Sequence, residues 1–149
     1  MAYKQFASGY FVKDKKVLLV HHNKFDKWVP PGGHIEENET PDQTVIREWK
    51  EEVGLDIKVL PAHPSAFGGD ENATPIPMPF HIDLEREDFD VPHIGYFFFV
   101  SAVVNDKEIN LQKSELFNAG WFSKDDLKNL KTFDQVRALA TYAIDYYPD

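Results

Sequence analysis

Three glutamates in the middle of the chain are spaced so that they would lie on one face of a helix. Glu48, Glu51 and Glu52 stand at positions i, i+3 and i+4, which places their side chains about one helical turn apart. Two such charges ~4 Å apart repel by about 4 kcal/mol at an effective dielectric constant of about 20. A cation would relieve this repulsion, and oxygen ligands suit a hard ion that keeps waters and also binds phosphates. We therefore expect Mg²⁺ or Mn²⁺ at this cluster.

The flanking residues predict a helix from about Pro41 to Val53. Thr40 is suited to the N-cap, Pro41 to the first helical position and Gln43 to the capping box. Gly54 suits the left-handed residue that follows the last turn. The three glutamates therefore belong to a helix whose two ends are both marked in the sequence.

A loop of prolines and glycines precedes this helix. The sequence Pro30-Pro31-Gly32-Gly33 lets the backbone approach a ligand closely and allows a carbonyl or an amide to point at it. Asn38 is one of the few non-glycine residue types that tolerate a positive φ, so we expect it to turn the chain just before the helix.

The loop and the helix together follow one fixed pattern. Gly33 is followed after five residues by Glu39 and after seven more by Arg47-Glu48; then come a hydrophobic residue, any residue, Glu51-Glu52, any residue, Gly54 and a hydrophobic residue. This pattern resembles the signature of the Nudix hydrolase family at every fixed position. Seven fixed letters match by chance on the order of 10⁻⁸ per window at about 7% usage per letter. The chain also resembles the family at residues 28–33 and at Trp121-Phe122.

The order of the expected elements is that of a mixed sheet flanked by helices. Strands are expected at 6–12, 16–22, 55–60, 80–84 and 94–104, a loop at 61–79, a helical turn after Ser123 and a last helix from Thr132. The resemblance implies an α/β fold, namely an α/β/α sandwich with a mixed β-sheet on which the signature helix packs. We expect residues 1–149 to form a single domain of this kind.

The resemblance also implies a reaction, the hydrolysis of a phosphoanhydride bond in a nucleoside diphosphate linked to another group. Nucleoside triphosphates and ADP-ribose-like compounds are the leading substrates. Glu48 and Glu52 are the expected metal ligands, Glu51 is expected to share the ions, and the family adds the backbone carbonyl of Gly32. Arg47 is expected to orient these carboxylates, the alternative being an ordinary surface ion pair.

Residues outside the helix are weaker candidates. Glu39 is expected to pair with Arg47 and to be architectural. Glu115 resembles an extra loop glutamate that some family members place over the metals, and a solvated carboxylate is the alternative reading. Trp28 and His93 are candidate substrate-binding residues. The stretch 61–93 is expected to form one wall of the pocket, because binding residues concentrate in loops.

Composition sets the remaining limits. The 149 residues are 42% hydrophobic and 14% aromatic, which argues for a folded globule with a core. The absence of cysteine excludes disulfides and thiolate metal sites.

Neither a signal peptide nor a membrane span is visible, so a cytoplasmic location is expected. A net charge of −9 argues against binding long nucleic acid. It permits a small phosphorylated substrate, since bound cations reverse the local field. Homodimer formation is left open.

Three alternatives to an enzyme explain the sequence less well. A nucleotide-sensing module of the same fold, which binds without cleaving, would be expected to lack a helix carboxylate, and all three are present. A structural metal domain would need a closed site, whereas clustered glutamates leave coordination positions open. A solvated acidic helix does not explain the fixed glycines. The sequence therefore favours a Nudix-type pyrophosphohydrolase.

Overall fold

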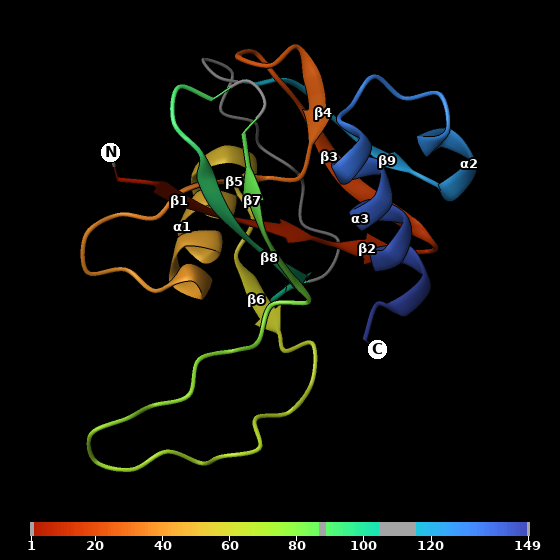
Figure 1. Cartoon of the computed structure of the whole chain (residues 1–149). Coiled ribbons are helices and arrows are strands. Elements are labelled where there is room, and N and C mark those ends of the chain that lie inside the picture. Colours follow the sequence, from red (N-terminus) through yellow and green to blue (C-terminus); the bar gives the residue numbers. More distant parts are fainter. Residues whose placement is uncertain (1, 87–88, 105–115, 149) are drawn as a thin grey trace.

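A computed structural model of the chain describes residues 2–86, 89–104 and 116–148 (Figure 1). The elements are, in chain order, β1 (Lys4–Tyr10), β2 (Val12–Lys13), β3 (Lys16–His22), β4 (Lys27–Val29), β5 (Gly32–His34), α1 (Pro41–Val53), β6 (Ile57–Leu60), β7 (His81–Glu85), β8 (His93–Ala102), β9 (Leu116–Phe122), α2 (Lys124–Leu127) and α3 (Asp134–Tyr146).

The strands form two sheets. The larger sheet has the order β5-β1-β8-β6, with β7 also paired to β8. β1 and β8 are parallel, whereas β5, β6 and β7 are antiparallel to their partners. This sheet is therefore mixed, as expected. The smaller sheet has the order β2-β3-β4, with β9 paired to β3, and all its pairs are antiparallel.

Side chains that alternate along the strands pack into two apolar cores, one on each face. Successive residues of a strand point to opposite faces, so Leu18 of β3 joins one core and Leu19 joins the other. The first core contains Trp49 of α1, and the second contains Ala140 of α3. The two helices lie on opposite sides of the strands (Figure 1). The predicted α/β/α arrangement is thus confirmed.

The signature helix begins and ends where the sequence predicted. α1 starts at Pro41 and is followed by Gly54 at φ 72°, and the Thr40 amide donates to the Gln43 side chain at 3.0 Å. Asn38 has φ 63°, as its residue type suggested. These features depend on neighbours in sequence, which explains why the sequence alone located them.

The last helix starts later than predicted. Its N-cap is Phe133, not Thr132. The Thr132 hydroxyl donates instead to the carbonyl of Trp28 in β4. The Thr132 hydroxyl, which the sequence suggested as a helix cap, is therefore engaged by Trp28, which lies 104 residues away in the chain.

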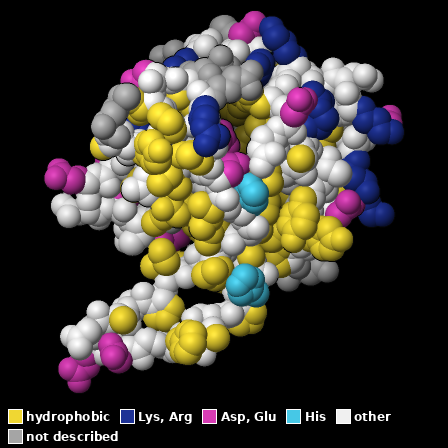
Figure 2. Space-filling model, viewed as in Figure 1, with side chains coloured by type: hydrophobic (Ala, Val, Ile, Leu, Met, Phe, Trp, Pro, Cys, Tyr) yellow, Lys and Arg dark blue, Asp and Glu magenta, His cyan; other side chains and the backbone are white. Residues whose placement is uncertain are grey.

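The proline-marked stretch forms a long excursion from the body of the protein (Figures 1 and 2). Its base is closed by the Ala62 amide, which donates to the Met78 carbonyl at 3.0 Å. Farther out, Phe67 is 82% exposed. No helix in the described part of the chain is both long enough and apolar enough to cross a membrane.

Candidate active site

A cleft of about 630 Å³ is bordered by both sheets and by the helices α1 and α3. Its walls come from β1, the β3–β4 turn, the loop and strand before α1, α1 itself, β7, the segment leading into β8, and the start of α3. This volume lies within the range of small-molecule sites, about 300–1,000 Å³. Two predicted metal ligands, Glu48 and Glu52, line it.

The glycine loop holds these two glutamates against the backbone of β5. Glu52 is 3% exposed, and its Oε1 accepts a hydrogen bond from the Gly32 amide at 2.8 Å. A Cβ on Gly33 would collide with the Glu48 carboxylate, and a Cβ on Gly32 would collide with the Ala7 carbonyl oxygen. Gly32 is therefore required by its close approach to backbone, whereas a side chain at Gly33 would force the Glu48 carboxylate to move. The observed contact of Gly32 is made by its amide, and metal binding by its carbonyl stays a prediction.

Arg47 links most of the acidic residues of the signature. Its Nε and Nη2 donate to Glu39 at 2.7 and 2.9 Å. Its Nη1 donates to Glu48 at 2.7 Å and to Glu51 at 3.3 Å, and its Nη2 also reaches the His34 carbonyl at 3.1 Å. The expected Glu39–Arg47 pair is present, and Arg47 contacts the carboxylates it was expected to orient.

The hydrogen bonds between Glu39 and Arg47 keep both side chains charged. Hydrogen bonds from Arg47 lower the pKa of Glu39 to about 2. The bond to Glu39, followed by that to Glu48, raises the pKa of Arg47 above its ordinary value. Both groups are therefore ionised at neutral pH, and the guanidinium partly offsets the negative charge of the helix face.

Glu51 lies apart from the other two glutamates. Its side chain is 57% exposed, and it is absent from the described residues that line the cleft. Within the described residues, no three Asp, Glu or His side chains converge closely enough to hold a metal ion. The structure therefore brings Glu48 and Glu52 together in the cleft, and a shared role for Glu51 stays a prediction.

A pair of histidines forms part of the cleft wall. His93, the predicted substrate contact, is 2% exposed and begins β8. Its Nδ1 lies 2.8 Å from the Val91 carbonyl, and its Nε2 lies 2.9 Å from Nε2 of His34. A carbonyl only accepts, so Nδ1 of His93 carries the proton, and in the neutral pair His34 donates to His93. Burial, followed by the neighbouring His93, lowers the pKa of His34.

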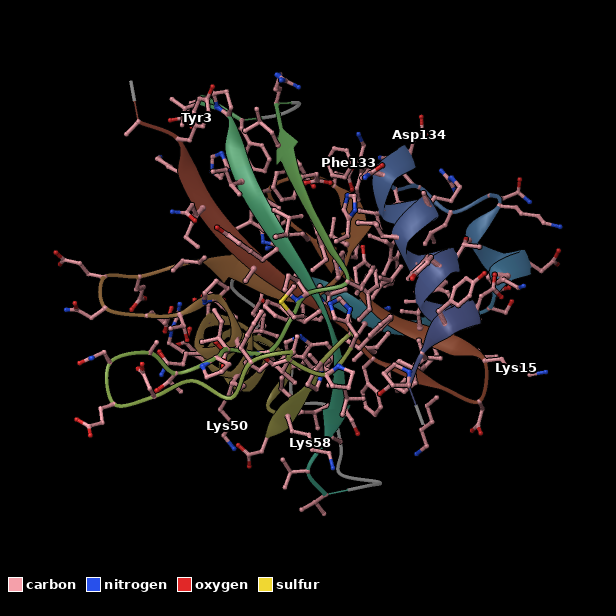
Figure 3. The ribbon with its side chains drawn as sticks, turned by 60° about the horizontal axis from the view of Figure 1, so that its bottom comes forward. Tyr3, Lys15, Lys50, Lys58, Phe133 and Asp134 are labelled. Atoms are coloured by element: carbon pink, nitrogen blue, oxygen red, sulfur yellow. The ribbon has the colours of Figure 1, made fainter. Side chains whose placement is uncertain are left out.

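Half-buried aromatic rings line the cleft near the start of α3. Phe25 of the β3–β4 turn meets Phe133 and Phe89 edge-on, with centroid distances of 5.7 and 6.0 Å. Phe133 lies beside Asp134 at the start of α3 (Figure 3). Lys24 Nζ is 5.6 Å from the Phe25 ring centroid. The sequence does not single out these residues or His34, because their position in the cleft comes from long-range packing and no local motif marks them.

Trp28 and Glu115, two further candidates from the sequence, are not found in the cleft among the described residues. Trp28 is not among the described residues that line the cleft; its ring stacks on His21 at 5.3 Å and meets Phe122 edge-on at 4.8 Å. Its neighbour Val29 lines the cleft instead. A substrate contact by Trp28 stays a prediction. Glu115 lies outside the described residues.

The stretch 61–93 contributes less than expected. Its last part lines the cleft through Glu85, Phe89 and His93, whereas residues 61–84 do not line it. The long excursion is directed away from the body (Figure 1). Within the described part of this stretch, the residues that line the cleft are therefore Glu85, Phe89 and His93.

Residues 4–142 match the family model described as the NUDIX domain. Among solved structures, the chain is 30% identical to a hydrolase of the NUDIX family from Clostridium perfringens, with a TM-score of 0.83 over 97% of this chain and 98% of the other.

Curated relatives match over short segments. An 8-oxo-dGTP diphosphatase of Proteus vulgaris is 53% identical over 30 residues, which cover 20% of this chain and 27% of the relative. An RNA pyrophosphohydrolase of Hydrogenovibrio crunogenus is 58% identical over 38 residues, covering 24% of this chain and 23% of the relative. The matched segments thus span about a quarter of either relative's length.

Proposed function

Because the chain belongs to the NUDIX family, we propose that it is a metal-dependent hydrolase that cleaves a phosphoanhydride bond in a nucleoside diphosphate linked to another group. The observation that carries this proposal is the position of Glu48 and Glu52 in the wall of a cleft of about 630 Å³. Nucleoside triphosphates and ADP-ribose-like compounds are the proposed substrates. The names of the relatives, an 8-oxo-dGTP diphosphatase and an RNA pyrophosphohydrolase, agree in the type of bond.

The donor set suits a hard divalent cation. Glu48 and Glu52 offer carboxylate oxygens at the cleft, and the backbone of Gly32 and Gly33 lies directly against them. Two protein carboxylates leave most coordination positions to waters and substrate phosphates, as Mg²⁺ prefers. We propose these glutamates as the ligands of Mg²⁺ or Mn²⁺, with Glu51 and the Gly32 carbonyl as further candidates. Such an ion would neutralise phosphate oxygens and acidify a bound water.

Protein side chains would position the metal ligands and bind the rest of the substrate. Arg47 keeps the Glu48 carboxylate in place and supplies a permanent positive charge beside it. The aromatic end of the cleft, around Phe25 and Phe133, would hold the group beyond the phosphates. Catalysis of phosphoryl transfer depends mainly on such positioning and charge neutralisation. A cytoplasmic location stays a prediction and homodimer formation stays open, and neither is needed for this proposal.

The test is a comparison of Glu52→Gln with the wild type over a panel of nucleotides and ADP-ribose. We expect hydrolysis only when Mg²⁺ or Mn²⁺ is present. The neutral isostere keeps the shape of the side chain but removes the charge that holds the ion, so kcat should fall by about a hundredfold or more. Product release measured by phosphate and nucleotide assays decides the matter.

The matched control is Glu71→Gln, which changes an exposed glutamate of the excursion. It should leave kcat unchanged. Full turnover by Glu52→Gln, or by the wild type in excess chelator, would refute the proposed metal site. Nucleotide binding without any turnover by the wild type would favour the alternative, a sensing module of the same fold.

A further inference from the structure

Two carboxyl groups lie together on β7. Asp83 and Glu85 are two residues apart, so they lie on the same face of the strand. Pairing of β7 with β8 places Asp83 opposite Gly95 and Glu85 opposite His93. Glu85 lines the cleft, whereas Asp83 is tied to α3 by the Gln135 side chain, which donates to its Oδ2 at 3.2 Å. Glu85 is thus the member of the pair that a ligand in the cleft can reach.

The pair holds a proton at neutral pH. Burial, and then the hydrogen bond and charge of Asp83, raises the pKa of Glu85 to about 8. A protonated carboxyl offers an O–H donor beside a carbonyl acceptor, whereas a carboxylate only accepts. Among the described residues, the ionisable groups that face the pair include Tyr10 of β1, His81 of β7 and His93 of β8, and Lys24 lines the same cleft. Burial and the charges of Glu85 and Asp83 raise the pKa of Tyr10, which stays neutral.

The aromatic rings of the cleft complete a site for a planar ligand. Phe25, Phe89 and Phe133 come from three separate segments and are all partly exposed. They meet edge-on, with interplanar angles of 84° for Phe25–Phe89 and 78° for Phe25–Phe133. The Phe89 ring also stacks on His93 at a centroid distance of 3.9 Å, and Lys27 Nζ lies 4.1 Å from the Phe133 centroid. A base can pack on the parts of the three rings that stay exposed in the cleft.

We propose that Glu85, positioned by Asp83, determines base specificity by hydrogen-bonding to the edge of a nucleobase packed against Phe25, Phe89 and Phe133. The inference rests on the proposed function, because it assigns the base end of the same cleft. The donor and acceptor of the neutral carboxyl match adenine and cytosine, whose ring nitrogen accepts beside an amino group that donates. The ionised form matches guanine, whose adjacent ring N–H and amino group both donate.

The test measures binding without catalysis. Isothermal titration calorimetry with AMP, CMP, GMP and UMP, in the absence of metal, is carried out on the wild type, Glu85→Gln and Glu85→Leu. From about pH 7 to about pH 8.8, across the pKa of about 8, the neutral form of Glu85 falls roughly sevenfold. The affinity of the wild type for AMP and CMP should fall by roughly that factor, while its affinity for GMP should rise as the carboxylate forms. Glu85→Gln keeps a donor and an acceptor but cannot ionise, so its ranking of nucleotides should match the wild type at the lower pH and not change with pH.

Glu85→Leu removes both hydrogen-bonding groups. Its affinity for AMP and CMP should fall by about tenfold, the loss expected for a hydrogen bond in a partly buried site. Its ranking of the four nucleotides should flatten. Glu71→Gln, on the excursion, should behave as the wild type at both pH values. Unchanged melting curves for Glu85→Gln show that any change in its binding is not a loss of folding.

Three outcomes would overturn the inference. They are a wild type that binds none of the four nucleotides, a base ranking independent of pH, and an equal loss of affinity for all four nucleotides in Glu85→Leu. Hydrolysis is measured separately on the same proteins. A wild type that binds AMP through Glu85 but hydrolyses no nucleotide would leave the inference standing and would contradict the proposed function alone.

Discussion

Arg47 is the residue on which the acidic face of α1 depends. Its guanidinium contacts Glu39, Glu48 and Glu51 at once, and the His34 carbonyl as well. A planar fork of fixed N–H groups can make these bonds together, whereas the single ammonium of lysine cannot. Arg47 therefore supports the proposed metal ligands through geometry as well as through charge.

The Glu39–Arg47 pair should make stability depend on pH. The pKa of Glu39 is lowered to about 2 from an ordinary value of 4.5, so its contribution is fully present above pH 4.5 and is lost as the pH falls towards 2. The side chain is only 14% exposed. Over this window the wild type should lose about 2 kcal/mol of unfolding free energy that Glu39→Gln does not lose, after allowance for solvent screening.

Urea unfolding of both proteins between these pH values measures the difference. Glu71→Gln serves as the control, because it removes an exposed carboxylate far from Arg47. It should lose stability in parallel with the wild type. Parallel curves for the wild type and Glu39→Gln would show that the ion pair contributes nothing to stability, whatever its geometry.

Individual site residues were predictable only where a local pattern marks them. Glu39, Arg47, Glu48 and Glu52 belong to one signature, and the structure brings these four together as expected. Glu85 carries no such mark, because its position in the cleft follows from the pairing of β7 with β8 and not from a local motif.

At the scale of elements, the same distinction separates α1 from α3. Both ends of α1 are fixed by neighbours in sequence, namely Pro41 and Gly54, and were predicted. The start of α3 was misplaced because Thr132 bonds to β4. Local capping signals are reliable only while no distant partner competes for the same side chain.

The excursion at 61–80 should be dispensable for substrate choice. None of its residues, all of which are described, lines the cleft, and its base is already closed by the Ala62–Met78 hydrogen bond. Replacing residues 64–76 with a short glycine linker should therefore leave kcat/KM for a nucleoside triphosphate and for ADP-ribose within about twofold of the wild type, since loop length alone costs little.

Phe89→Ala provides the comparison, because this ring does line the cleft. It should lower kcat/KM for both substrates by about tenfold through lost stacking. A changed ranking of the two substrates after shortening the excursion would restore the whole stretch 61–93 as a selectivity element.

At the scale of the molecule, the sequence indicated the layers but not how the strands join. Parallel pairing of β1 with β8 connects residues about 90 positions apart, as in Lys4 opposite His93. No local periodicity reports such a pairing, and the family resemblance supplied it only in outline. The division into two sheets, which leaves room for the cleft between β1, β4 and α3, was for this reason not predicted.

The net charge of −9 and the position of Glu48 and Glu52 lead to a prediction about the whole protein. A cation that binds the folded acidic face, but not the unfolded chain, stabilises the fold by about 2.7 kcal/mol at a hundredfold excess over its dissociation constant. For a chain of 149 residues this corresponds to a rise in Tm of about 5–10 °C. Calorimetry with and without Mg²⁺ measures this rise in Tm, and NaCl of equal ionic strength controls for general screening.

The variant Glu52→Gln should lose the Mg²⁺-specific part of the rise in Tm while keeping the response to NaCl. Equal rises in Tm for Mg²⁺ and NaCl in the wild type would mean that the cation only screens the net charge, and that any metal site forms only with the substrate phosphates present.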